Sequence, residues 1–225
     1  DRPRSGDVAT FLRQTRAIQA VTQRQARLIF ALDATASREP TWAQAAALHT
    51  ELFSAAAETS SLAVQLCYYR GIGQFQSSHW LTAPGALLDQ MSGVTCEAGI
   101  TQISTLLQHA LDAGSASQPI RALIFVGDAC EEAAEPLLSL AGQCGIKKLP
   151  LFLFQEGNDA TTRAVFQRMA QISGGATVPF DASSADLLRQ LLGAVARFAR
   201  GGLKALQDSG ATGDQLLLAQ LEKGP

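Results

Sequence analysis

From Ala26 onward, short apolar runs alternate with longer amphipathic stretches, and this alternation constrains the fold more than any other feature. Most residues within a run are apolar at consecutive positions, which is typical of parallel strands covered by helices on both faces. The pattern predicts an α/β domain with a doubly wound, mostly parallel sheet. The expected strands are Arg27–Leu32, Leu62–Tyr69, Ile120–Val126, Leu149–Phe154 and Thr177–Phe180, with Gln74–Trp80 as a further strand at one edge.

Helices are expected between these strands, and several carry start or stop signals. Pro40 and Asp159 stand where helices begin, whereas Gly145 and Gly174-Gly175 stand where helices end. The expected helices are Thr41–Ser60, Gly85–Met91, Ile103–Ala113, Glu131–Gln143, Thr161–Ser173 and Ser184–Arg200.

Both ends of the chain carry additions to a central domain that spans residues 26–200. Residues 1–25 mix apolar and polar positions as one amphipathic helix does, so they are expected to form an N-terminal helical extension. Residues 201–225 are expected to form a tail in which Asp214 caps a short helix, Gln215–Glu222.

The composition excludes several classes of protein. With 47% hydrophobic and 17% charged residues, the 225-residue chain is globular and long enough to bury a substantial core. Its net charge of −2 gives no argument for binding nucleic acid, and no stretch is apolar enough to span a membrane. The four cysteines have no C-x-x-C spacing, so they are expected to be reduced and structural, which favours a cytoplasmic location.

A run of small polar residues, Asp33-Ala34-Thr35-Ala36-Ser37, directly follows the first apolar stretch. One carboxylate and two hydroxyls at alternating positions, just where a buried strand ends, are able to point at one spot. Hard divalent cations such as Mg²⁺ prefer such oxygen ligands. The run therefore predicts part of a metal site; the alternative is an ordinary loop in which these side chains accept backbone hydrogen bonds.

Two later segments offer further oxygen atoms in loops of the same kind. Asp128 follows the expected strand Ile120–Val126, and ligands of doubly wound sheets bind beyond the carboxyl ends of the strands. Thr101 stands just before the expected helix Ile103–Ala113. Glu131 and Glu132 are expected in the first turn of the helix Glu131–Gln143, where acidic residues are favourable. We expect one Mg²⁺ or Mn²⁺ to be held, directly or through water, by Asp33, Thr35, Ser37, Thr101 and Asp128.

These segments together resemble the von Willebrand factor type A domains, also called the integrin I-domain fold, over about residues 26–200. That family has D-x-S-x-S after its first strand, a threonine before a helix and an aspartate after its fourth strand. The segments Gly99-Ile100-Thr101 and Ile172-Ser173-Gly174-Gly175 also match the rhythm of the family. The resemblance implies a metal-ion-dependent adhesion site in which the two aspartates act through water.

The chain departs from the family pattern at several positions. Thr35 replaces a serine, Ile100 replaces the second glycine of the G-G-T segment, and Gly127 precedes Asp128 where the family has threonine. Thr95 also competes with Thr101 for the threonine role. None of these departures removes an oxygen ligand, so metal binding is the favoured interpretation.

Two classes of function compete. The resemblance implies a protein-interaction module, not an enzyme, whose cation is completed by a partner's Asp or Glu; an ATPase of the AAA+ class is one such partner. The compact single-domain layout favours a bacterial-style module, and the cysteines favour the cytoplasm. The alternative is a phosphoryl-transfer enzyme of the haloacid dehalogenase type, which needs a second carboxylate where Thr35 stands. A degenerate von Willebrand A scaffold that binds no metal is the third interpretation.

Overall fold

The computed structural model describes residues 25–39, 62–180 and 185–222. The expected helix Thr41–Ser60 and nearly all of the N-terminal extension lie outside this part of the chain. The strands are β1 (Ala26–Asp33), β2 (Leu62–Arg70), β3 (Gln74–Ser77), β4 (Ile120–Gly127), β5 (Leu151–Glu156) and β6 (Ala176–Phe180). The helices are η1 (Ala36–Arg38, a 3-10 turn), α3 (Pro84–Ser92), α4 (Ile103–Ala113), α5 (Ala134–Ile146), α6 (Ala160–Ser173), α7 (Ala185–Ser209) and α8 (Thr212–Leu221).

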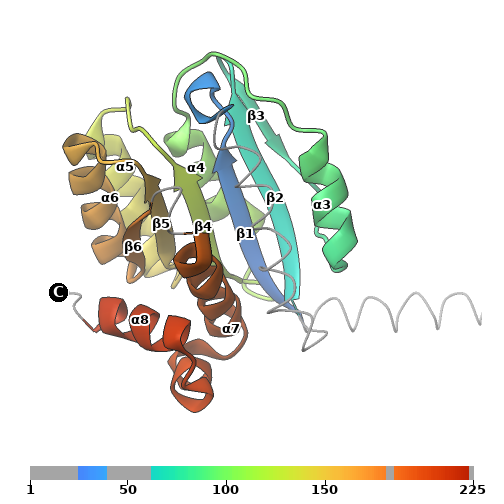
Figure 1. The fold of residues 1–225 in the computed structure, drawn as a ribbon, viewed down its shortest axis with the longest axis vertical. Coiled ribbons are helices and arrows are strands. Elements are labelled where there is room, and N and C mark those ends of the chain that lie inside the picture. Colours follow the sequence, from blue (N-terminus) through green and yellow to red (C-terminus); the bar gives the residue numbers. More distant parts are fainter. Residues whose placement is uncertain (1–24, 40–61, 181–184, 223–225) are drawn as a thin grey trace, which may run out of the picture.

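The strands form one sheet in the order β3-β2-β1-β4-β5-β6 (Figure 1). β3 runs antiparallel to β2, and every other pair is parallel. This arrangement confirms the expected doubly wound α/β fold with one antiparallel edge strand. The strand order reverses between β1 and β4, where Leu32 pairs with Val126. The carboxyl ends of these two strands therefore lie side by side, and a ligand site is expected beyond them.

Helices cover both faces of the sheet, which explains why its strands are apolar at consecutive positions. In β1, Leu28 and Phe30 belong to the core under α7, whereas Ile29 and Ala31 belong to the core under α4 and α5. Successive side chains of a strand point to opposite faces. Both faces are buried here, so both sets must be apolar. In Figure 1, α7 lies in front of the sheet and α4 behind it.

Three helices differ from the prediction: α5, α7 and α8, which begins at Thr212 instead of the expected Gln215. α5 begins at Ala134, three residues after the expected start at Glu131, because the glutamates before it bind elsewhere, as described below. α7 continues past Arg200 to Ser209 through a kink at Gly202, whose φ of 64° is one that glycine adopts at little cost.

The C-terminal helix α8 packs against α7 and β6. Asp214 was expected to cap this helix, but the N-cap position is Ala211, and the Asp214 side chain is fully buried. Its carboxylate accepts hydrogen bonds from the Arg197 guanidinium of α7 at 2.7–3.0 Å. A buried carboxylate requires such a partner, and this pair fixes α8 to the domain. No described helix is long and apolar enough to cross a membrane.

Candidate metal centre

Asp33 is the last residue of β1, and its side chain is 0% exposed. Its Oδ1 accepts the backbone N–H of Thr35 at 2.8 Å, and its Oδ2 accepts the hydroxyl of Tyr69 at 3.0 Å. Burial raises the pKa of Asp33 and the nearby Asp128 carboxylate adds to this, while the hydrogen bonds from Thr35 and Tyr69 lower it. The carboxylate is thus fixed in place and desolvated, which is the state that a cation would stabilise.

Thr35 and Ser37 bring two hydroxyls together beside Asp33. The 3-10 turn η1 starts after Thr35, and the backbone N–H of Arg38 closes it by donating to the Thr35 carbonyl at 3.0 Å. This turn puts Ser37 Oγ 3.1 Å from Thr35 Oγ1. Thr35 is buried and Ser37 is exposed, so the hydroxyl pair runs from the interior to the surface.

Asp128 follows β4 directly and is half-buried. Its Oδ1 is buried and has no hydrogen-bond partner among the described residues. Such an atom normally has a partner, because an unmet buried acceptor costs about 1–3 kcal/mol. Gly127 allows this loop to lie close to β1: a Cβ there would be 2.7 Å from the ring of Phe125 and 3.5 Å from the Cβ of Asp33.

Thr101 is buried and lies against the loop after β4. Its Oγ1 accepts the backbone N–H of Glu131 at 3.0 Å, and its own backbone N–H donates to Glu131 Oε2 at 3.0 Å. This reciprocal pair attaches the start of α4 to the loop that carries Asp128. The rival Thr95 is exposed, and its hydroxyl accepts a hydrogen bond from Arg70 at 2.6 Å.

The structure therefore brings four of the five expected ligands together through direct contacts or charge interaction: Asp33, Thr35, Ser37 and Asp128. Thr101 joins them through the shared loop, with its hydroxyl oxygen already accepting one hydrogen bond. The donors are all oxygen atoms, which suits Mg²⁺ or Mn²⁺. Within the described residues no group of three or more His, Cys, Asp or Glu could hold a metal ion, so hydroxyls would complete any site here.

The sequence did not predict the roles of three residues at this edge of the sheet, Tyr69, Glu131 and Glu132. Tyr69 is buried in β2, and burial raises its pKa well above the ordinary value of 10.0, with Asp33 raising it further. The Glu132 carboxylate accepts the backbone N–H groups of Ile103 and Ser104 and the Ser104 hydroxyl, so it caps α4. Both Glu131 and Glu132 were expected in the first turn of the following helix, α5, which instead begins at Ala134. A phenol within a buried strand is itself a signal, because such a hydroxyl needs a partner.

An ion pair spans the same edge. Arg38 follows Ser37, is 1% exposed, and places Nη1 3.0 Å from Oε2 of Glu156 at the end of β5. The strand order puts β4 between β1 and β5. The pair therefore links the loop after β1 to the far side of the Asp128 loop.

Together these features define an oxygen-lined site at the switch point of a doubly wound sheet. No sequence-family model and no curated protein matches the chain. Solved structures do match it: a von Willebrand factor type A protein from Catenulispora acidiphila has a TM-score of 0.61 at 14% identity and covers 79% of this chain. The SpRpn10 VWA domain has a TM-score of 0.59 at 13% identity, and the match covers 74% of this chain and 94% of that domain.

The pilus adhesin SpaC from Lactobacillus rhamnosus GG matches with a TM-score of 0.58 at 13% identity, covering 79% of this chain. The chain spans 43% of the Catenulispora protein and 31% of the adhesin. The fold is thus that of the von Willebrand factor type A domains, as the sequence indicated.

Proposed function

We propose that this chain is a protein-interaction module in which Mg²⁺ or Mn²⁺ binds at the carboxyl edge of the sheet and is completed by an Asp or Glu of a partner protein. The observation that carries this proposal is the meeting of Asp33 and Asp128 in a largely buried setting, with Asp128 Oδ1 unpartnered among the described residues. Two desolvated carboxylates that repel one another favour a bound cation between them.

The hydrogen bonds indicate which residues would hold the cation directly. Both oxygens of Asp33 already accept hydrogen bonds, so Asp33 would act through water. Thr35 and Ser37 present hydroxyl oxygens side by side, and Asp128 presents its unpartnered oxygen. Bound there, the dication would supply a positive charge that a partner's carboxylate completes. The exposed Ser37 marks the side from which that carboxylate would approach.

The same geometry supports an interaction module over a phosphoryl-transfer enzyme. The second carboxylate that haloacid dehalogenase chemistry requires would stand at position 35, where the Thr35 hydroxyl instead contacts Ser37. We therefore propose a non-enzymatic role, acting in the cytoplasm, where the four free cysteines would stay reduced. An ATPase of the AAA+ class is the partner to test first, because the family resemblance implies it.

Calorimetric titration of Mn²⁺ and Mg²⁺ into the metal-free protein tests the proposal. We expect binding near one equivalent that is lost in Asp128→Asn and in Asp33→Ala. Asp112→Asn is the matched control, since Asp112 is an exposed carboxylate on α4 whose one hydrogen-bond partner among the described residues is Gln108. Binding that persists in both site variants, or no binding at about 10 mM metal, would reject the metal site. The second result would favour the degenerate scaffold.

A further inference from the structure

A second polar site lies at the opposite, amino-terminal edge of the sheet. A pocket of about 340 Å³ opens there between the starts of β4 and β5 and the kink of α7. Arg121 is the second residue of β4, Lys148 precedes β5, and Arg200 stands next to the Gly201-Gly202 kink. The residues that line the pocket are Arg121, Lys148, Pro150, Phe198, Ala199, Arg200, Gly201 and Gly202.

The lining is strongly basic. Three of its eight residues are cationic and none is acidic, in a chain whose net charge is −2. All three cations are exposed, and none of them forms an ion pair or hydrogen bond with its side chain among the described residues. Like charges that converge without a counterion repel one another, so an anion bound between them would be favoured.

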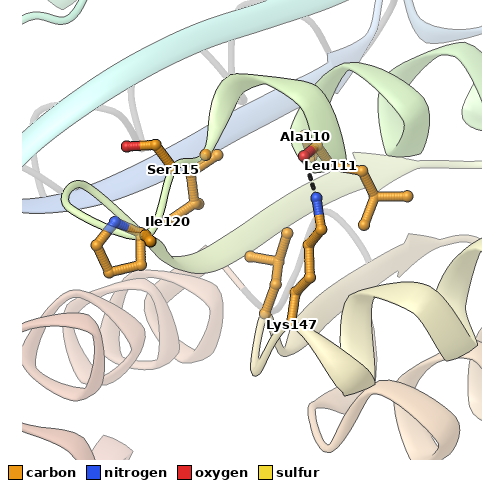
Figure 2. Close-up of a pocket in the computed structure, with 9 residues that line it drawn as sticks. Ala110, Leu111, Ser115, Ile120 and Lys147 are labelled. Atoms are coloured by element: carbon orange, nitrogen blue, oxygen red, sulfur yellow. Dashed lines mark hydrogen bonds between the residues drawn. The ribbon is translucent and has the colours of Figure 1, made fainter.

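A neighbouring lysine shows the contrast. Figure 2 shows the adjacent apolar pocket, where Lys147 Nζ donates to the Leu111 carbonyl at 2.7 Å. That ammonium already serves the C-terminal end of α4, where a cation is favourable. Lys148, the next residue, has no such partner in the described part of the chain and lines the basic pocket instead.

The backbone around the basic pocket is specialised. Lys148 has a φ of 56° and is the sole non-glycine residue with positive φ in the described part of the chain. This conformation closes the end of α5, where the backbone N–H groups of Lys148 and Leu149 donate to the carbonyls of Gly145 and Cys144 at 3.0 and 2.9 Å. At Gly202 an added Cβ would meet nothing within 4 Å, so the pocket is open at the kink.

The pocket also has an apolar wall. Phe198 packs edge-on against Phe152 with ring centroids 5.5 Å apart, and Pro150 lies nearby in the lining. The volume of about 340 Å³ exceeds what a bare inorganic anion needs. An anionic group bound by the three cations would therefore leave room for an organic group against Phe198.

We propose that this pocket binds a small phosphate monoester. Arginine presents a planar fork of donors that matches phosphate oxygens, and two arginines with one lysine suit a dianion better than a single carboxylate. The organic group of the ester would pack on Phe198 and Pro150. This site is separate from the proposed metal centre, because it lies at the other ends of the strands.

A calorimetric titration of phenyl phosphate into the protein at low salt tests the proposal. We expect the affinity to fall at least about tenfold in Arg121→Gln/Arg200→Gln, since each arginine donates charged hydrogen bonds. Arg168→Gln is the matched control, because Arg168 is an exposed cation of α6 outside the pocket, and it should change affinity less than about twofold. Arg200→Lys, which keeps the charge, should lose less than Arg200→Gln.

Two further probes distinguish the possible sources of the bound phosphate group. One is inorganic phosphate, and the other is phosphatidylcholine vesicles that contain phosphatidic acid. Stronger binding of phenyl phosphate than of inorganic phosphate supports the monoester with its apolar wall. Binding to the vesicles that the double variant abolishes supports the same site with a lipid headgroup as its ligand. No binding of any probe at about 10 mM, or equal loss in Arg168→Gln, would overturn the proposal.

Discussion

Strand β4 connects two edges of opposite character. At its carboxyl end Asp128 meets the buried Asp33, whose two carboxylate oxygens both accept hydrogen bonds. At its amino end Arg121 joins two other exposed cations that have no partner among the described residues. The carboxyl edge thus has a buried charged residue, Asp33, whereas the charged side chains at the amino edge are exposed to solvent. We expect substitutions to affect both stability and metal binding at the first edge, and mainly anion binding at the second.

The largest stability effect is expected at the buried ion pair of the carboxyl edge. Arg38→Ala would leave Glu156, whose side chain is 13% exposed, without the guanidinium 3.0 Å away. Breaking a buried pair costs about 3–5 kcal/mol of unfolding free energy. Urea denaturation measures this value. The double variant Arg38→Met/Glu156→Leu should recover most of the loss, and a loss below about 0.5 kcal/mol in Arg38→Ala would contradict burial-dependent pairing.

A smaller loss is expected from Tyr69→Phe, which removes only the hydroxyl that donates to Asp33 Oδ2. The buried acceptor then lacks one partner, which costs about 1–3 kcal/mol. Because this hydrogen bond lowers the pKa of Asp33, the variant should raise that pKa further. Denaturation gives the first quantity, and NMR titration of the Asp33 carboxyl carbon gives the second. Tyr68→Phe on the same strand is the matched control.

Glu132→Gln is expected to cost about 1–2 kcal/mol, because the carboxylate that caps α4 across the loop becomes neutral. Glu131 is exposed, and within the described ranges its carboxylate accepts one backbone N–H group, that of Thr101. Glu131→Gln should therefore cost less. Comparison of the two denaturation midpoints ranks them. The reverse order would show that the Thr101 contact, not the helix cap, holds this loop.

The pH dependence of stability tests the raised pKa of Asp33. Burial and Asp128 raise it above the ordinary value of 3.8, so the folded state binds this proton more tightly than the unfolded state. Its contribution is fully present below that ordinary value and is lost as the pH rises through the raised pKa. Asp33→Asn cannot titrate there, so metal-free denaturation should show the variant gaining stability relative to the wild type across this window. A constant difference would contradict the raised pKa.

The smallest effect is expected at the amino edge, where Arg121→Gln should change stability by less than about 0.5 kcal/mol. Arg121 is exposed and has no partner to lose among the described residues. Thermal unfolding checks this expectation. A loss comparable to that of Arg38→Ala would remove the contrast between the two edges.

The fold could be predicted from the sequence because it depends on local pattern. The apolar runs predicted five of the six described strands, and the edge segment Gln74–Trp80 predicted the sixth, β3, which ends at Ser77. Helix α4 has the expected bounds, Ile103–Ala113. Asp159 caps α6 as expected, since its side chain accepts the Thr162 N–H at 2.6 Å. Gly145 was expected to end α5 but lies inside it, where a Cβ would be 2.6 Å from the Ile172 carbonyl oxygen. This glycine serves helix packing, which a local pattern does not specify.

The candidate site could be predicted in part. Asp33 and Asp128 follow apolar runs, so their meeting needed only the strand order of a doubly wound sheet. The contact of Tyr69 with Asp33 depends on the register in which these two residues pair, and Glu132 reaches α4 across a loop. Arg197 and Asp214 pair across a helical kink. Such partners are set by tertiary geometry, whereas each residue alone has an ordinary local explanation.

The position of α8 has a consequence for self-association. A sheet with open edges is able to recruit strands from other molecules and so aggregate. Here one outer strand, β3, is only four residues long and carries Gln74, Gln76 and Ser77. The other outer strand, β6, has α8 packed against it, held to α7 by Arg197 and Asp214. Removing α8 would therefore be expected to promote aggregation through β6 as well as to weaken the domain.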